Sequence, residues 1–199
     1  LPRVTLILAK LAGIDPGGRL ANRPLNSLRE IFIWWHPGTN ATMEEKLAAI
    51  DLILVCEPHT GWDLLANLLP DSTGSISHTT SKPRWRDIGD LPKGIMTRRG
   101  QVKYLSAIVD RALDQVGSDP ERWRGILHSL RFIGSILQDK ALNLLSSIVK
   151  DQMPDDKVKA LWEILRDYIN EHRAFRDADW AVSEALLEKM DDILASIAP

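Results

Sequence analysis

Cysteine and long apolar runs are scarce in this sequence of 199 residues. Its single cysteine, Cys56, can form no disulfide within the chain and cannot build a cysteine-based metal cluster, which is typical of a reducing compartment. The longest apolar run, residues 50–55, is interrupted by Asp51 and is far shorter than the ~18 residues of a membrane-spanning helix. We therefore expect a cytoplasmic protein without a transmembrane segment.

Catalytic and cofactor-binding motifs are also missing. The five histidines are scattered, and none lies in a Gly-x-Ser-x-Gly or His-Glu-x-x-His setting. The glycines form no phosphate-binding loop of the Gly-x-x-x-x-Gly-Lys or Gly-x-Gly-x-x-Gly type. We expect no catalytic residue, no cofactor and no metal site, and hence no enzyme. Cys56 is predicted to be a core residue, and His59 to lie at a helix end and bond free carbonyl groups.

A strong excess of charge of one sign is absent as well. The formal net charge is −2, whereas dedicated nucleic-acid-binding or membrane-surface proteins usually show a clear basic excess. The expected partner is therefore another protein, or other domains of the same parent chain.

Strand signals are absent, and what the sequence does contain is helical periodicity. Pro24, Pro120 and Pro154 fit the starts of helices, and Thr42 with Glu45 three residues later forms a capping box. Leu47, Ile50, Leu54 and Val55 are the expected apolar face of the helix that follows Thr42. Apolar residues at helical spacing predict helices over residues 4–11, 24–36, 42–57, 62–69, 97–116, 120–130, 139–149, 154–175 and 183–197.

About nine helices with mostly short connections predict an all-α fold of antiparallel helical hairpins, arranged as an α-solenoid or a repeat-like bundle. One long central loop interrupts the pattern. We expect an N-terminal helical block over residues 1–70, a basic loop over residues 71–96 and a C-terminal helical block over residues 97–199. Structureless connections beyond ~15 residues are uncommon in compact domains and are usually functional, disordered or linkers.

Positive charge is concentrated around this loop. Between residues 70 and 103 there are seven basic and three acidic residues, whereas residues 150–199 contain seven basic and twelve acidic ones. Arg84 and Arg86 flank Trp85 and could present two guanidinium groups and an aromatic ring to a phosphate, a base or an acidic protein. The alternative that we favour is that Trp85 anchors the loop while the arginines pair with the acidic C-terminal helices. The candidate partner-binding residues are Lys82, Arg84, Trp85, Arg86, Arg98 and Arg99.

Several local strings point to a known class of protein. They are Leu28-Arg29-Glu30-Ile31-Phe32, Leu68-Leu69-Pro70, Lys82-Pro83-Arg84-Trp85-Arg86-Asp87, Glu121-Arg122-Trp123 and the segment from His172 to Trp180. Together they resemble the helical C-terminal regions of large bacterial multidomain proteins, including STAND or NACHT-type ATPases associated with phage defence. The resemblance implies a sensor or scaffold, with ATPase and effector activity located elsewhere in the parent protein.

Three functions follow as hypotheses. The leading one is a non-catalytic helical scaffold or sensor module that contacts a protein partner or other parts of a larger bacterial protein. It is motivated by the all-α pattern, by the absence of catalytic constellations and by residues 1–3, which contain neither an initiator methionine nor the start of a signal peptide, as expected of an excised segment. The alternative is a nucleic-acid or nucleotide-sensing module that uses the basic, Trp-containing loop. The third is an enzyme with an unfamiliar site, which would require a polar cleft.

Overall fold

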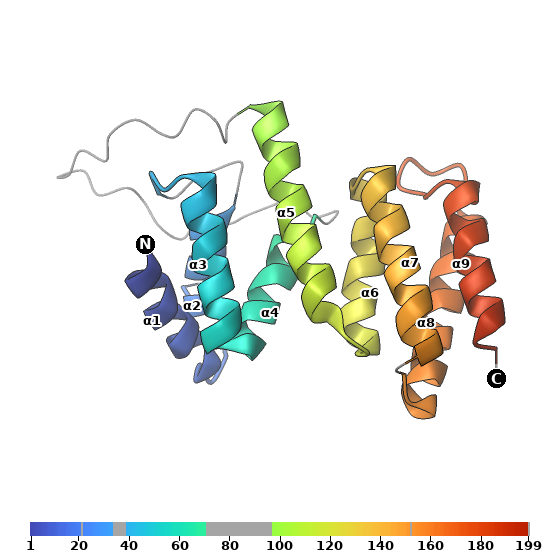
Figure 1. The fold of residues 1–199 in the computed structure, drawn as a ribbon, viewed down its shortest axis with the longest axis horizontal. Helices are drawn as coiled ribbons and strands as arrows, with labels where there is room; N and C mark the ends of the chain where they lie inside the picture. The colour runs from blue at the N-terminus through green and yellow to red at the C-terminus, as the bar shows by residue number, and fades with distance from the viewer. Residues whose placement is uncertain (21, 34–38, 71–96, 152, 199) are drawn as a thin grey trace. The chain divides into compact units, whose positions relative to one another are not determined.

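The computed structural model describes residues 1–20, 22–33, 39–70, 97–151 and 153–198. Within these ranges the chain forms nine α-helices and one short 3₁₀ helix, with no strand, so the predicted all-α fold is confirmed (Figure 1). The elements are α1 (Pro2–Gly13), α2 (Pro24–Phe32), α3 (Met43–Cys56), α4 (Pro58–Leu68), α5 (Arg98–Val116), α6 (Pro120–Ser129), η1 (Leu130–Phe132), α7 (Ser135–Asp151), α8 (Asp155–Ala174) and α9 (Glu184–Ser196).

Side-chain caps begin several of these helices, as the sequence predicts. The backbone N–H of Glu45 donates to Thr42 Oγ1 over 3.2 Å, and the N–H of Thr42 donates to Glu45 Oε2 over 2.8 Å, which completes the capping box of α3. Asp119 Oδ1 accepts from the N–H of Glu121 at the start of α6. Because a cap needs only residues within one turn, the start of such a helix can be predicted from the local sequence.

Helices α1 to α4 form two stacked pairs in the first of two compact units, Leu1–Ala112. Helix α1 contacts α2, and α3 contacts α4; across the pairs, α1 packs on α3 and α2 packs on α4 (Figure 1). Leu28, Phe32, Ile50 and Leu64 are fully buried in this core. This arrangement is the stacking of helical hairpins expected of a repeat-like bundle.

Polar contacts attach α5 to the same unit. The Tyr104 hydroxyl donates to the carbonyl oxygen of Phe32 over 2.7 Å, and this hydrogen bond is buried. The Arg111 guanidinium binds both carboxylate oxygens of Asp51 on α3, at 2.6 and 2.8 Å. Burial raises the pKa of Tyr104 far above its ordinary value, so the hydroxyl stays protonated and remains a donor.

The second unit, Leu113–Pro199, contains α6 to α9. Helix α8 packs on both α6 and α9, and α7 packs on α9. Trp123 of α6 is fully buried, and its indole N–H donates to the carbonyl of Gly117 over 2.9 Å. Gly117 has a φ of 56°, a left-handed conformation that glycine adopts without strain and that commonly ends a helix, here α5.

Three sequence predictions about α3 and α4 were wrong. Val55 is 79% exposed and Cys56 is exposed, whereas the side chains that α3 buries include Ala49, Ile50 and Ile53. Apolar residues surround almost all of α3, so periodicity could not identify the buried stripe. His59 lies in the first turn of α4, not at a carboxyl end, and its Nδ1 is 3.2 Å from Asp63 Oδ2.

Two further comparisons concern boundaries. Helix α7 begins at Ser135, four residues before the predicted start at Asp139. The N–H groups of Leu137 and Gln138 already donate to the carbonyl of Gly134, which forms the first turn of the helix there. The predicted division into residues 1–70, 71–96 and 97–199 stays a prediction, since its middle segment lies outside the described residues.

In the part of the chain that the structure describes, no helix combines the length and apolar character that a bilayer crossing requires.

Candidate interaction surfaces

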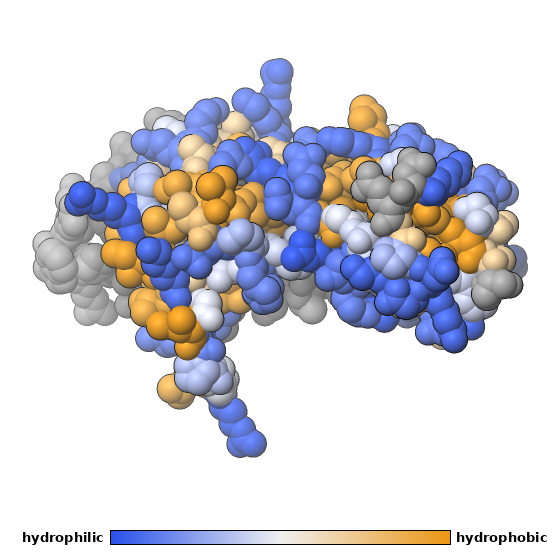
Figure 2. Space-filling model, turned by 60° about the horizontal axis from the view of Figure 1, so that its bottom comes forward, coloured by the Kyte–Doolittle hydropathy of each residue, from blue (hydrophilic) through white to orange (hydrophobic). Residues whose placement is uncertain are grey.

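A row of apolar side chains lies exposed along α1. Val4, Ile7 and Leu11 are 58%, 59% and 45% exposed, and Ile14, directly after the helix, is 79% exposed. Thr5 and Ala9 on the other side of α1 are fully buried. Figure 2 shows apolar side chains at the surface of this N-terminal unit. Helix α1 is therefore apolar on both sides and packed on only one of them.

Two basic residues accompany this row. Arg3 and Lys10 are exposed and directly precede Val4 and Leu11 in sequence, and α1 contains no acidic residue. The nearest carboxylate in sequence, Asp15, accepts a hydrogen bond from the Arg23 guanidinium over 2.7 Å. The exposed row thus has positive charge along one edge.

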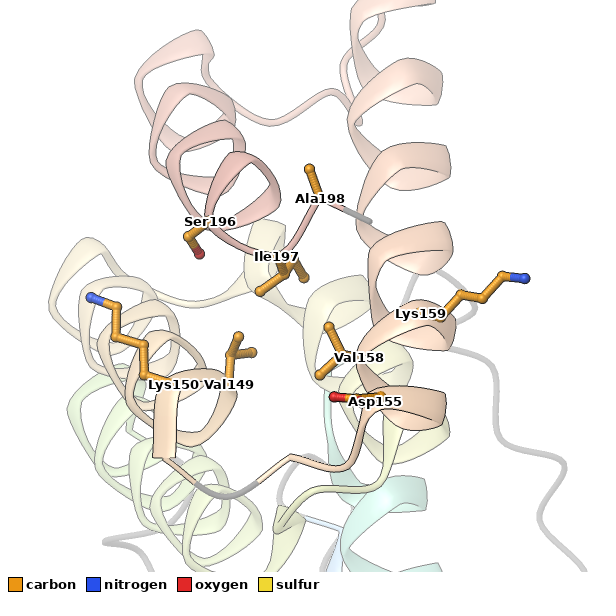
Figure 3. A pocket seen from close by; sticks show the side chains of 8 residues that line it. All are labelled: Val149, Lys150, Asp155, Val158, Lys159, Ser196, Ile197 and Ala198. Carbon is orange, nitrogen blue, oxygen red and sulfur yellow. The ribbon is translucent and has the colours of Figure 1, made fainter.

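A groove of about 470 Å³ lies in the second unit, where the ends of α7 and α9 meet the start of α8. Val149, Val158 and Ile197 form its apolar part, while the side chain of Lys159 points away from it (Figure 3). Its remaining lining residues are Lys150, Asp155, Ser196 and Ala198. Its one carboxylate is Asp155, and the hydroxyl of Ser196 donates to the carbonyl of Ile193 over 2.7 Å.

A buried aromatic cluster joins α8 to the connection before α9. The rings of Tyr168 and His172 have centroids 4.2 Å apart, and Trp180 meets His172 edge to face at 5.2 Å. His172 Nδ1 accepts a hydrogen bond from the N–H of Val182 over 3.2 Å. Burial lowers the pKa of His172, which favours the neutral ring, and raises the pKa of Tyr168 to about 12. These contacts explain the cluster as packing between α8 and α9.

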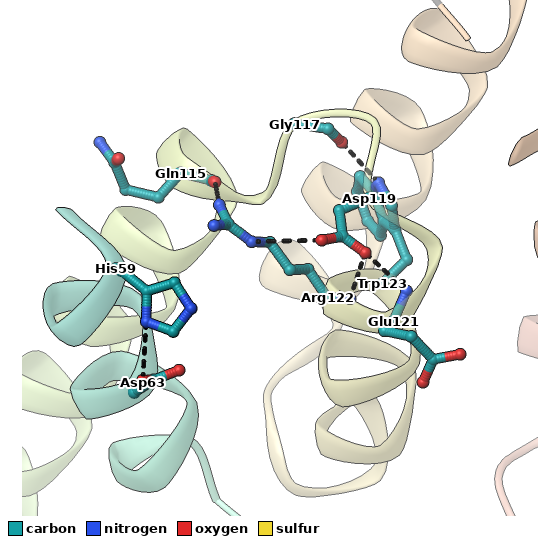
Figure 4. Close-up of polar contacts among 8 residues, drawn as sticks. All are labelled: His59, Asp63, Gln115, Gly117, Asp119, Glu121, Arg122 and Trp123. Atoms are coloured by element: carbon teal, nitrogen blue, oxygen red, sulfur yellow. Dashed lines mark hydrogen bonds and ion pairs between the residues drawn. The ribbon is translucent and has the colours of Figure 1, made fainter. Parts of the chain in front are cut away.

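The corner between α5 and α6 is held by a compact set of polar contacts (Figure 4). The Arg122 guanidinium donates to the carbonyl of Gln115 over 2.7 Å and lies 3.7 Å from the carboxylate of Asp119. Because Asp119 also caps α6, its carboxylate is occupied by the fold. The arrangement stabilises a turn and offers no open site.

The sequence-predicted partner-binding residues are only partly described. Lys82, Arg84, Trp85 and Arg86 lie outside the described residues. Arg98 and Arg99 are exposed side by side at the start of α5, where Thr97 Oγ1 accepts the N–H of Gly100 over 3.0 Å. The nucleic-acid hypothesis therefore stays a prediction that rests on this basic pair and on the undescribed loop.

Sequence reasoning missed the most unusual buried group, Lys46 on α3. Its side chain is fully buried, and its ammonium nitrogen has no hydrogen-bond partner. Burial lowers the pKa of Lys46 to about 8. Lys46 lies at helical spacing from Ala49, Ile50 and Ile53, and this spacing is the only feature of the sequence that indicates its burial. Because α3 also has apolar residues on its other sides, the sequence does not show which stripe is buried.

Metal-ligand groups and known relatives give no further assignment. Among the described residues, no group of three or more His, Cys, Asp or Glu side chains could hold a metal ion. No family model matches the chain, and no curated protein or solved structure is detectably similar to it. The exposed surfaces of the described helices are therefore the remaining guide to function.

Proposed function

We propose that this chain is a non-catalytic helical scaffold or sensor module that contacts a protein partner or other domains of a larger bacterial protein. The observation that carries the proposal is the exposed apolar row of Val4, Ile7 and Leu11 on α1, with Ile14 directly after the helix. Contiguous exposed apolar patches mark interaction sites.

Covering the exposed row on α1 would stabilise the protein. Fully burying a Val, Leu or Ile side chain stabilises a protein by about 1.5–3 kcal/mol relative to leaving it exposed. Val4, Ile7 and Leu11 are each about half exposed, so covering all three is worth on the order of 3 kcal/mol. Single exposed residues elsewhere, such as Ile136 on α7, need no such explanation.

The resemblance to helical regions of STAND or NACHT-type defence proteins supports the sensor form of this proposal, in which ATPase activity lies elsewhere in the parent chain. An exposed free thiol at Cys56 supports a cytoplasmic location, since such thiols persist in reducing compartments. The proposed setting is therefore the inside of a bacterial cell, in contact with a protein surface.

Site-specific photo-crosslinking tests the proposal. The photoreactive residue p-benzoylphenylalanine is placed at Ile7 in one preparation and at Ile136, which is 84% exposed on α7, in a matched control. After irradiation in an extract of the source organism, peptide mass spectrometry identifies the joined segments. We expect one discrete protein segment joined to position 7 and not to position 136. Identical, nonspecific products at both positions would contradict the proposal.

A further inference from the structure

The exposed row on α1 has the spacing of a helix-pairing seam. Positions 4, 7 and 11 of the helix, followed by the C-cap residue Ile14, alternate steps of three and four residues, which is the a and d pattern of a heptad repeat. Such a pattern forms a narrow stripe that matches the width of one partner helix, because knobs at a and d insert between four residues of the facing helix. The opposite face, with Thr5 and Ala9, is already occupied by the fold.

The basic residues hold a defined place in this pattern. If Val4 and Leu11 are a positions, then Arg3 and Lys10 are both g positions, which lie at the edge of the seam and select the charge of the partner. No carboxylate on α1 neutralises them, and Asp15 is paired with Arg23. The seam therefore has one purely cationic edge.

We infer that α1 docks a single amphipathic helix of another protein segment, one with apolar a and d residues and with Asp or Glu along the edge that faces Arg3 and Lys10. This inference rests on the proposed function and adds the shape and charge of the partner. Oppositely charged edges raise specificity because a basic partner would face like charges.

A second copy of the chain fits this seam poorly. In an antiparallel pair the g positions face each other, so Arg3 and Lys10 would meet the same two cations. In a parallel pair Lys10 would face Asp15 of the copy, a carboxylate that Arg23 already holds at 2.7 Å. Charge thus favours a different, acidic helix.

Binding to designed peptides tests the inference with the 199-residue chain. Two labelled peptides of about 21 residues carry Ile at a and Leu at d, one with Glu and the other with Lys at every e and g position. We expect the Glu peptide to bind about 10-fold tighter in low salt, by fluorescence anisotropy. This ratio should shrink near 0.5 M salt, where charges are screened.

Three variants locate the binding. Arg3→Glu with Lys10→Glu should invert the preference between the peptides without touching the packed side of α1. Ile7→Asp should abolish binding of the Glu peptide, whereas Ile136→Asp should leave it unchanged. Circular dichroism checks that each variant keeps its helices, and the double charge variant tests the inference even if Ile7→Asp unfolds.

The following results would overturn the inference. Equal affinity for both peptides, or a preference that the double charge variant does not move, removes the charge selection. Dimerisation that Ile7→Asp abolishes would assign the row to a second copy, and Ile7-dependent binding to phosphatidylglycerol vesicles would assign it to a membrane. A specific crosslink at position 7 combined with equal peptide affinities would refute the inference and keep the proposed function; loss of both would refute the two together.

Discussion

Helices α1 and α8 differ in where they place their apolar side chains. In α8, Leu161, Leu165 and Ile169 are buried, and no large apolar residue of that helix is strongly exposed. In α1, Val4 and Ile7 face solvent while a threonine is buried on the packed side. The large apolar side chains of α8 are thus mostly covered within its own unit, whereas α1 has a second apolar side that the described residues of its unit leave about half exposed.

The contrast extends to charged groups in the same two units. In the C-terminal unit, charged side chains pair at the surface, as Arg173 does with Glu184 and Asp191 and Lys189 does with Asp139. The Nε atom of Arg131 is buried there without a hydrogen-bond partner, but the residue is still partly exposed. In the N-terminal unit, Lys46 is buried without a hydrogen-bond partner. The N-terminal unit therefore places both apolar and charged groups at a cost to its stability as an isolated fold.

The largest expected loss of stability comes from a substitution in the core of the C-terminal unit. Trp123→Ala removes a fully buried ring and the hydrogen bond from its indole N–H to Gly117. We expect a loss of about 3–5 kcal/mol in the free energy of unfolding, because a large cavity remains. Urea denaturation measures the loss, and hydrogen exchange should locate it in α6 and α8. A loss below about 1 kcal/mol would mean that this core is not tightly packed.

The next prediction concerns the buried charge of the N-terminal unit. Burial lowers the pKa of Lys46 to about 8 from 10.5, so the unfolded chain binds more protons than the folded chain between these values. Stability of the natural protein should therefore rise as the pH rises from 8 towards 10.5. Lys46→Met removes the buried ammonium and should stabilise the protein by about 2–3 kcal/mol at pH 7.

Paired titrations check this prediction. The difference in unfolding free energy between Lys46→Met and the natural protein should shrink as the pH approaches 10.5, because alkaline effects common to both cancel. Lys159→Met, at an exposed position on α8, is the matched control and should show no such trend. A pH-independent difference would show that folding does not lower the pKa of Lys46, as for an ammonium that reaches solvent.

The sequence was informative wherever a short stretch decides the structure. The Thr42 box begins α3 and Pro120 begins α6 as predicted, because each signal needs only a few neighbouring residues. Which side of α3 faces the core depends on packing against other helices, and apolar residues on almost every side of α3 leave no periodic signal. The exposure of Cys56 and the burial of Lys46 were missed for this reason.

The smallest expected effect bears most directly on the comparison between α1 and α8. Ile7→Ser in α1 removes a side chain that is 59% exposed and only partly buried, so the free energy of unfolding of the isolated chain should fall by only about 1 kcal/mol. Leu165→Ser in α8 changes a fully buried side chain and should cost about 3 kcal/mol or more. Urea denaturation of both variants provides the measurement. If Ile7→Ser were as destabilising as Leu165→Ser, the row on α1 would be part of the folded core, and its role in docking a partner would have to be abandoned.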